Sequence, residues 1–132
     1  MICAVYDTNV LVSALITKHP DSSTTKVLEF LYEGHIIPIY NEEILKEYQE
    51  VLSRPKFPIN PNAITGLISF IQHNGIQAER EPVDNWKLPD ESDRVFYEVS
   101  LSQEDSYLVT GNKKHFPITP KVVSPAEMVA IV

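Results

Sequence analysis

Acidic residues occupy three places in the sequence from which a fold could bring their side chains together. Asp7 directly follows an apolar segment, residues 2–6, and Asp90-Glu91-Ser92-Asp93 opens a predicted helix. On another predicted helix, residues 42–53, the acids are Glu42, Glu43, Glu47 and Glu50. Converging carboxylates repel one another unless a cation neutralises them, and Mg²⁺ and Mn²⁺ prefer such oxygen ligands. Such an ion can activate water and stabilise the charge of an attacked phosphodiester.

The helical period ranks the glutamates of residues 42–53 by their distance from the buried face. The apolar stripe of this segment consists of Ile44, Leu45, Tyr48, Val51 and Leu52. At about 100° per residue, Glu47 lies about 100° from the centre of the stripe and Glu42 about 120°, with Glu43 and Glu50 further round. The period therefore favours Glu47 as the glutamate nearest the core, with Glu42 a close second.

Each of these acids also has an ordinary structural explanation. Asp7 and Asp90 stand where helix caps and turn residues are common, and Asp93 falls in a first helical turn, where acids are favoured. Glu47 on its own is typical of a solvated helix position. No metal-ligand spacing relates the histidines, which are interpreted as surface or loop residues: His19, His35, His73 and His115.

The elements that would position the acids alternate between strand and helix. Strands are predicted over residues 2–6, 36–40, 76–81, 106–110 and 122–123. Helices are predicted over residues 10–16, 24–33, 42–53, 61–74 and 90–101, and from Ser124 onward. This alternation predicts right-handed crossovers and an α/β fold in which helices cover both faces of a mostly parallel sheet. Ligands of such sheets bind outside the carboxyl ends of the strands, where Asp7 is expected.

Length and charge limit the class of protein. A chain of 132 residues is long enough for one domain with a buried core, so residues 1–132 are predicted to form a single domain. The net charge of −7 argues against a large basic surface for nucleic acid, but not against an enzyme that reaches phosphates through a divalent cation. No apolar run approaches the ~20 residues that span a bilayer, and the N-terminus lacks the basic region of a signal peptide. A cytoplasmic location, away from membranes, is therefore expected.

Five segments resemble, in order, the motifs of PIN domains, most closely those of the branch that includes toxins of toxin–antitoxin systems. They are residues 5–15, 43–57, 90–96, 107–112 and 124–127, and they span almost the whole chain. The first contains Val5-Tyr6-Asp7-Thr8-Asn9, and the fourth is Tyr107-Leu108-Val109-Thr110-Gly111-Asn112. The first motif alone is suggestive, and the order of all five makes the resemblance specific.

The resemblance implies a PIN-like three-layer fold and metal-dependent endonucleolytic cleavage of RNA. The implied ligands of Mg²⁺ or Mn²⁺ are Asp7, Glu47 and Asp93, in agreement with the ranking of the glutamates. The residues implied to support them are Thr8, Asn9, Asp90 and Thr110. Asn112 stands where the fourth motif usually has Asp, and it can offer a carbonyl oxygen but no charge. One metal is therefore expected rather than two.

The prediction is an endoribonuclease that hydrolyses RNA phosphodiesters, with a protein antitoxin as partner and homodimerisation as a further implication of the family. The candidate phosphate contacts are Arg54, Lys56, Lys113 and Lys114. Two alternatives stay open. One is a PIN-like module that binds RNA or protein without strong catalysis, which Asn112 and the acidic charge motivate. The other is a phosphotransferase with Asp7 as nucleophile, for which an acid is expected at the position of Asn9.

Overall fold

A parallel sheet forms the centre of the computed structural model, which describes residues 1–84 and 87–132. Over these residues the sheet has five strands in the order β3-β2-β1-β4-β5, and each neighbouring pair is parallel. The strands are β1 (Ile2–Tyr6), β2 (Ile36–Tyr40), β3 (Ile76–Gln77), β4 (Tyr107–Val109) and β5 (Val122–Val123). The predicted α/β fold with a parallel sheet is confirmed.

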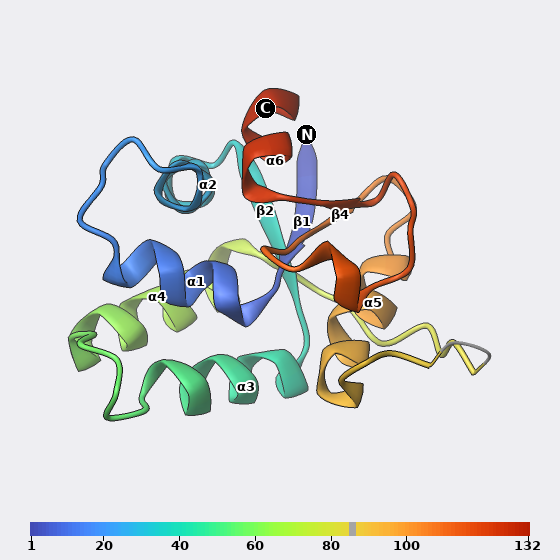
Figure 1. The fold of residues 1–132 in the computed structure, drawn as a ribbon, viewed down its shortest axis with the longest axis horizontal. Coiled ribbons are helices and arrows are strands. Elements are labelled where there is room, and N and C mark those ends of the chain that lie inside the picture. The colour runs from blue at the N-terminus through green and yellow to red at the C-terminus, as the bar shows by residue number, and fades with distance from the viewer. Residues whose placement is uncertain (85–86) are drawn as a thin grey trace.

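Helices flank this sheet on both sides. They are α1 (Thr8–Ile16), α2 (Ser23–Glu33), α3 (Glu42–Leu52), α4 (Pro61–Asn74), α5 (Arg94–Leu101) and α6 (Pro125–Ile131). In Figure 1, α1, α2 and α4 lie on one side of β1 and β2, and α5 lies on the other. The 3₁₀ turns are η1 (Glu91–Asp93) and η2 (Lys113–His115). No helix in the described ranges is long and apolar enough to cross a membrane.

The beginning and the middle of α3 are both tied to the rest of the fold. The Asn41 side chain accepts a hydrogen bond from the Ile44 amide at 2.8 Å, which caps the helix. Further along, the buried Tyr48 hydroxyl donates to the backbone oxygen of Tyr6, the last residue of β1. This bond links α3 to the carboxyl end of β1, and Glu47 is the neighbour of the residue that makes it.

Proline in a strand usually marks an end or an edge of a sheet, yet Pro38 belongs to β2, which lies between β1 and β3. Proline is accommodated there because β3 is short. The pairing with β3 begins at Ile39, one residue after Pro38. On the same side, Gly75 passes so close that an added Cβ would lie 2.6 Å from the Pro38 oxygen.

Three predicted boundaries also differ. Residues 76–81 were expected to form a strand, but β3 is only two residues long. The helix expected over 90–101 divides into η1 and α5. The first helix begins at Thr8 rather than Val10, so the residues directly after Asp7 belong to its first turn.

Candidate active site

Asp7 and Thr110 lie side by side because β1 and β4 end together. Tyr6 is aligned with Val109 in the parallel register, so the next residue of each strand emerges at the same edge. The Thr110 hydroxyl donates to Asp7 Oδ2 at 2.7 Å, and both residues are buried. Asp7 occupies the N-cap position of α1, yet its side chain makes no capping hydrogen bond of normal geometry to the described residues of that helix. Capping of α1 alone therefore does not account for the Asp7 carboxylate, which is bonded across the sheet edge to Thr110.

Asp7 opens into a pocket of about 200 Å³ that also contains the other predicted acids. The walls come from the first turn of α1, from α3 and the turn after it, and from η1 with the start of α5. The lining residues are Asp7, Thr8, Asn9, Glu47, Val51, Arg54, Asp90, Ser92, Asp93 and Phe96. Four carboxylates from three distant parts of the sequence therefore face one small volume.

Three of these carboxylates carry a raised pKa. Burial, together with the charges of Asp7 and Asp90, raises the pKa of Asp93 to about 6. Burial also raises the pKa of Glu47, with Glu50 adding to the effect and Arg54 opposing it. Burial is the largest cause of the raised pKa of Asp93, Glu47 and Asp7, so the pocket disfavours the charged form of each acid.

The pKa of Asp7 is raised by burial as well, although hydrogen bonding from Thr110 and from the Asn9 and Thr8 amides lowers it. Asp90 behaves differently. It is exposed, and its side chain accepts hydrogen bonds from the Ser92 hydroxyl at 2.7 Å and the Ser92 amide at 3.0 Å. These bonds lower the pKa of Asp90, and the capping explanation holds for this residue.

The donor set fits a hydrated divalent cation. Over residues 1–84 and 87–132, no three His, Cys, Asp or Glu side chains converge closely enough to ligate one ion together. Mg²⁺, however, keeps several waters and is commonly held by only one or two carboxylates. Thr8 supplies a second observation, because it lines this pocket and its buried Oγ1 lacks a hydrogen-bond partner among the described residues. Rotation of the Thr8 side chain toward the pocket would let a water held there satisfy that hydroxyl.

Asn112 and Thr110 lie behind the pocket rather than in its wall. The Asn112 amide N–H donates to Thr110 Oγ1 at 3.0 Å, and Asn112 Nδ2 lies 3.0 Å from His115 Nε2. The other ring nitrogen, His115 Nδ1, lies 3.2 Å from Asp93 Oδ2. His115 is therefore bonded to a predicted site residue, which its interpretation as an ordinary surface residue missed. The available signal was its position three residues after Asn112, one turn of a 3₁₀ helix.

The predicted phosphate contacts divide into two groups. Arg54 lines the pocket, is about half exposed and forms a long ion pair with Glu50, at 3.8 Å. Lys113 instead binds Glu127 at 2.8 Å. Lys114 is exposed beside Lys113, and the Lys56 ammonium lies 5.1 Å from the ring centroid of the neighbouring Phe57. None of these three lysines is among the residues that line the described pocket.

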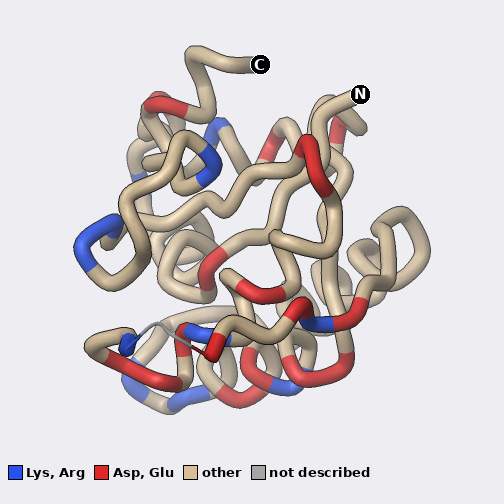
Figure 2. Tube along the Cα trace, turned by 90° about the vertical axis from the view of Figure 1, so that its right-hand side faces the viewer, with Lys and Arg blue, Asp and Glu red and all other residues tan. Residues whose placement is uncertain are grey.

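Charge is not sorted into one basic surface. On the face shown in Figure 2, Lys and Arg positions are scattered among Asp and Glu positions. This distribution agrees with the net charge of −7 and leaves Arg54 as the basic residue that lines the acidic pocket.

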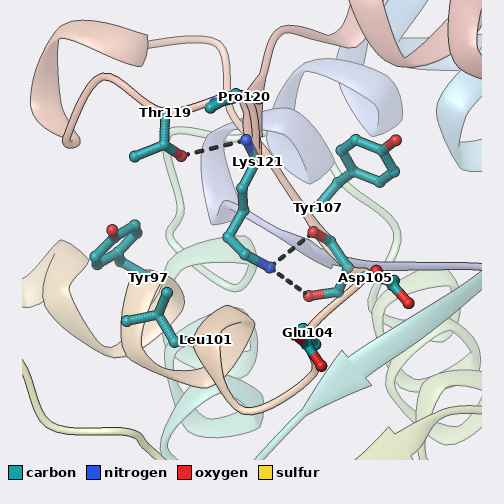
Figure 3. A pocket seen from close by; sticks show the side chains of 9 residues that line it. Tyr97, Leu101, Glu104, Asp105, Tyr107, Thr119, Pro120 and Lys121 are labelled. Carbon is teal, nitrogen blue, oxygen red and sulfur yellow. Dashed lines mark hydrogen bonds between the residues drawn. The ribbon is translucent and has the colours of Figure 1, made fainter.

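A larger cavity, about 520 Å³, lies near the amino ends of β4 and β5, at the opposite edge of the sheet. The amine that lines this cavity is bound to the protein itself. Lys121 Nζ donates to the backbone oxygens of Ser100 and Ser106, at 2.9 and 2.7 Å. Figure 3 shows this lysine side chain reaching toward the segment that follows α5. Burial lowers the pKa of Lys121. The cavity therefore surrounds a lysine that fixes the end of α5, and it does not gather the predicted acids.

Comparison with known proteins identifies the class. A family model described as a PIN domain matches residues 3–114, which is most of the chain, and the chain belongs to the PIN-domain family. Members of this family are nucleases.

A solved structure shares the fold. The crystal structure of VapBC2 from Rickettsia felis, bound to a DNA fragment from their promoter, matches with a TM-score of 0.55. The match covers 93% of this chain and 97% of that chain at 20% sequence identity, so the likeness is one of fold. Curated protein sequences give no significant match.

Proposed function

We propose that this PIN-domain protein is a metal-dependent endoribonuclease that hydrolyses RNA phosphodiester bonds. The observation that carries the proposal is the pocket at the carboxyl edge of the sheet, where Asp7, Glu47 and Asp93 all have raised pKa values. A divalent cation would stabilise the charged forms of these carboxylates, which burial disfavours. Membership of a nuclease family supports the same chemistry.

In this proposal Asp7, Glu47 and Asp93 hold Mg²⁺ or Mn²⁺, directly or through water. A bound ion would supply a water of lowered pKa and a positive charge for the phosphate. The Thr8 hydroxyl would orient a water of that ion, since it is buried and unpaired among the described residues. Thr110 holds Asp7 by the 2.7 Å hydrogen bond already described.

The other polar residues that line the pocket have smaller roles in this proposal. Asp90 orders η1 through Ser92 and adds negative charge at the mouth of the pocket. Asn9 is exposed in the first turn of α1 and lines the mouth as well. Arg54 is placed to bind a phosphate of the RNA as it enters. Lys56, Lys113 and Lys114 do not line the pocket. They would contact only RNA phosphates that lie further along the strand than the scissile bond.

We further propose that the protein is the toxin of a toxin–antitoxin system, with residues 1–132 acting as a single domain. The similar fold in the VapBC2 structure supports this assignment. An antitoxin protein is the expected partner, and a homodimer the expected assembly. Co-purification with the product of an adjacent gene would test the partner, and light scattering would test the assembly.

Cleavage of a labelled RNA in Mn²⁺ and in EDTA tests the nuclease proposal. We expect cleavage by the wild-type protein in Mn²⁺ only. Asp7→Asn should reduce it by at least ~100-fold, because several kcal/mol of charge stabilisation are lost with the metal. Asp105→Asn is the matched control, since Asp105 is an exposed acid at the opposite edge of the sheet, and it should cleave normally. Equal cleavage in EDTA, or retained cleavage by Asp7→Asn, would contradict the proposal.

A second candidate is a PIN-like module that binds RNA or protein without strong catalysis. It is favoured by the lack of a three-ligand cluster within the described ranges and by the uncharged Asn112. Titration calorimetry with Mn²⁺ separates the two functions. Site-specific binding that is lost in Glu47→Gln supports the nuclease, and the absence of binding supports the module.

A further inference from the structure

Asn112 and His115 connect Asp7 and Asp93, two carboxylates of the acidic site, by a continuous path of hydrogen bonds. From Asp7 the path runs through the Thr110 hydroxyl to the Asn112 backbone amide. From the Asn112 side chain it continues to the His115 ring and ends on Asp93 Oδ2. The path joins a carboxylate that follows β1 to one that precedes α5.

The chemistry of the groups fixes the direction of each bond. The Thr110 hydroxyl donates to Asp7, so its oxygen accepts from the Asn112 amide. The Asn112 Nδ2 group can only donate, so His115 Nε2 accepts. A neutral imidazole that accepts at Nε2 carries its proton on Nδ1, and Nδ1 therefore donates to Asp93. Both arms start at Asn112 and both end at a carboxylate.

We propose that Asn112 and His115 are positioning residues that hold Asp93 and Asp7 in a fixed relation for the metal. The inference rests on the proposed function and gives Asn112 a role other than that of a lost acid. An aspartate at position 112 has no side-chain hydrogen to donate to His115 Nε2. Asn112, which replaces the usual aspartate of the fourth motif, can therefore make a hydrogen bond to His115 that an aspartate could not donate.

The segment that carries this bridge is anchored at several points. The His115 amide donates to the Asn112 oxygen at 3.0 Å, which closes the η2 turn. Phe116, directly after the turn, is 5% exposed and belongs to the hydrophobic core. Lys113 binds Glu127 at the start of α6. A side chain on such a support can fix a ligand within the narrow limits that a metal site needs.

The hydrogen bond from His115 stabilises a carboxylate that its surroundings disfavour. Burial, and then the charges of Asp7 and Asp90, raise the pKa of Asp93, whereas His115 lowers it. His115 Nδ1 binds the Oδ2 atom of Asp93. The cation or its water would therefore bind Asp93 through Oδ1.

Two near-isosteric substitutions separate the arms of the bridge. In His115→Asn the side-chain amide nitrogen takes the place of Nδ1, so the bond to Asp93 is kept and the bond to Asn112 is lost. In His115→Gln the amide takes the place of Nε2, so the bond to Asn112 is kept and the bond to Asp93 is lost. The measured quantities are Mn²⁺ affinity by calorimetry, kcat and KM for RNA cleavage, and thermal unfolding. His73→Gln, at an exposed position of α4, is the control.

We expect His115→Gln to weaken Mn²⁺ binding by about 10- to 100-fold, the range found for outer-sphere partners of metal ligands. His115→Asn should retain most of the affinity, and both variants should unfold like the wild type. Cleavage should follow affinity through kcat, with KM for RNA little changed. Equal losses in the two variants, or equal affinity in all proteins, would overturn the inference while leaving wild-type cleavage, and thus the proposed function, intact.

A spectroscopic measurement tests the same bridge without metal or activity. Nitrogen-15 NMR of the metal-free protein at pH 8 distinguishes the two neutral tautomers of His115. We expect the proton on Nδ1, whereas free imidazole side chains favour Nε2. Asn112→Leu, which cannot donate to Nε2, should reduce the Nδ1-protonated form. An Nε2-protonated ring in the wild type would overturn the inference whatever the protein does with RNA.

Discussion

Two groups of acidic residues lie close together in this fold, and only one of them is neutralised. The first is centred on Glu98 of α5, which is 4% exposed. Its Oε1 accepts from Arg80 Nε at 2.6 Å, and its Oε2 accepts from the Val83 amide at 2.7 Å, with Arg94 at 4.0 Å. Each oxygen of this buried carboxylate has a donor, and the connector before η1 is attached to α5 through it.

The second group lines the candidate active site. Asp7, Glu47 and Asp93 share their pocket with Arg54, which is about half exposed and 3.8 Å from Glu50. Their pKa values are raised. The fold therefore places a guanidinium nitrogen 2.6 Å from Glu98, whereas burial disfavours the charged forms of the three pocket acids. The difference indicates a structural role for Glu98, and it agrees with the proposal that a cation binds the second group.

The largest expected effect comes from breaking the neutralised group. Glu98→Ala removes a partner of Arg80 and of the Val83 amide, and should lower the free energy of unfolding by about 3 kcal/mol, at the low end for a buried ion pair because Arg80 is partly exposed and keeps Glu43. Asp7→Asn should leave the metal-free stability unchanged or raise it, because it removes repulsion and keeps an acceptor for Thr110. Urea denaturation in EDTA measures both. A larger loss in Asp7→Asn than in Glu98→Ala would reverse the comparison.

The contrast between the two groups also marks the limit of what the sequence could predict. Asp7 at a strand end and Glu47 on the inner side of α3 follow from local patterns, since period and element order are written along the chain. The partner of Glu98 does not, because Arg80 lies 18 residues away and no periodicity relates them. The contact of His115 with Asp93 spans 22 residues and depends on the register of β4 beside β1.

The end of the strand predicted over residues 76–81 was wrong for the same reason. Residues 76–81 have strand-like composition, but β3 pairs only through Ile39 and Tyr40 of β2. The chain then approaches α5, where the Glu81 amide donates to the backbone oxygen of Glu98 at 3.0 Å. The length of an edge strand is set by its partner, and proline in β2 is tolerated by the same short pairing. Such features appear only when the tertiary neighbours are in place.

The second prediction concerns metal. Mn²⁺ at 100 times its dissociation constant should raise the free energy of unfolding by about 2.7 kcal/mol, because the ion binds the folded chain. Asp93→Asn should lose this stabilisation. Asp105→Asn, at the opposite edge of the sheet, should keep it. Thermal unfolding at a fixed ionic strength with Mn²⁺ or EDTA measures the effect, and equal stabilisation of all three proteins would show that the ion binds elsewhere.

The third prediction concerns pH. The pKa of Asp93 is about 6 in the folded chain against 3.8 as its ordinary value, so the folded state binds this proton more tightly than the unfolded state does. The stabilisation is complete below about pH 4 and is lost as the pH rises through 6. In EDTA, Asp93→Asn should match the wild type near pH 4 and exceed it in stability above pH 6. A difference that is constant between pH 4 and pH 7 would contradict this.

The smallest expected effect is at Thr8, which lines the candidate active site and has a buried hydroxyl without a partner among the described residues. Around Glu98 each carboxylate oxygen has a donor, whereas Thr8 Oγ1 is buried without a partner in the described part of the chain. Thr8→Val keeps the shape and removes that unsatisfied atom, so the metal-free stability should stay the same or rise slightly. Mn²⁺ affinity should fall about 10-fold, within the range for outer-sphere partners, because a water of the ion loses its acceptor. An unchanged Mn²⁺ affinity would mean that the unpaired Thr8 hydroxyl has no role in metal binding. The difference between the two acidic groups would then be a difference between their carboxylates alone.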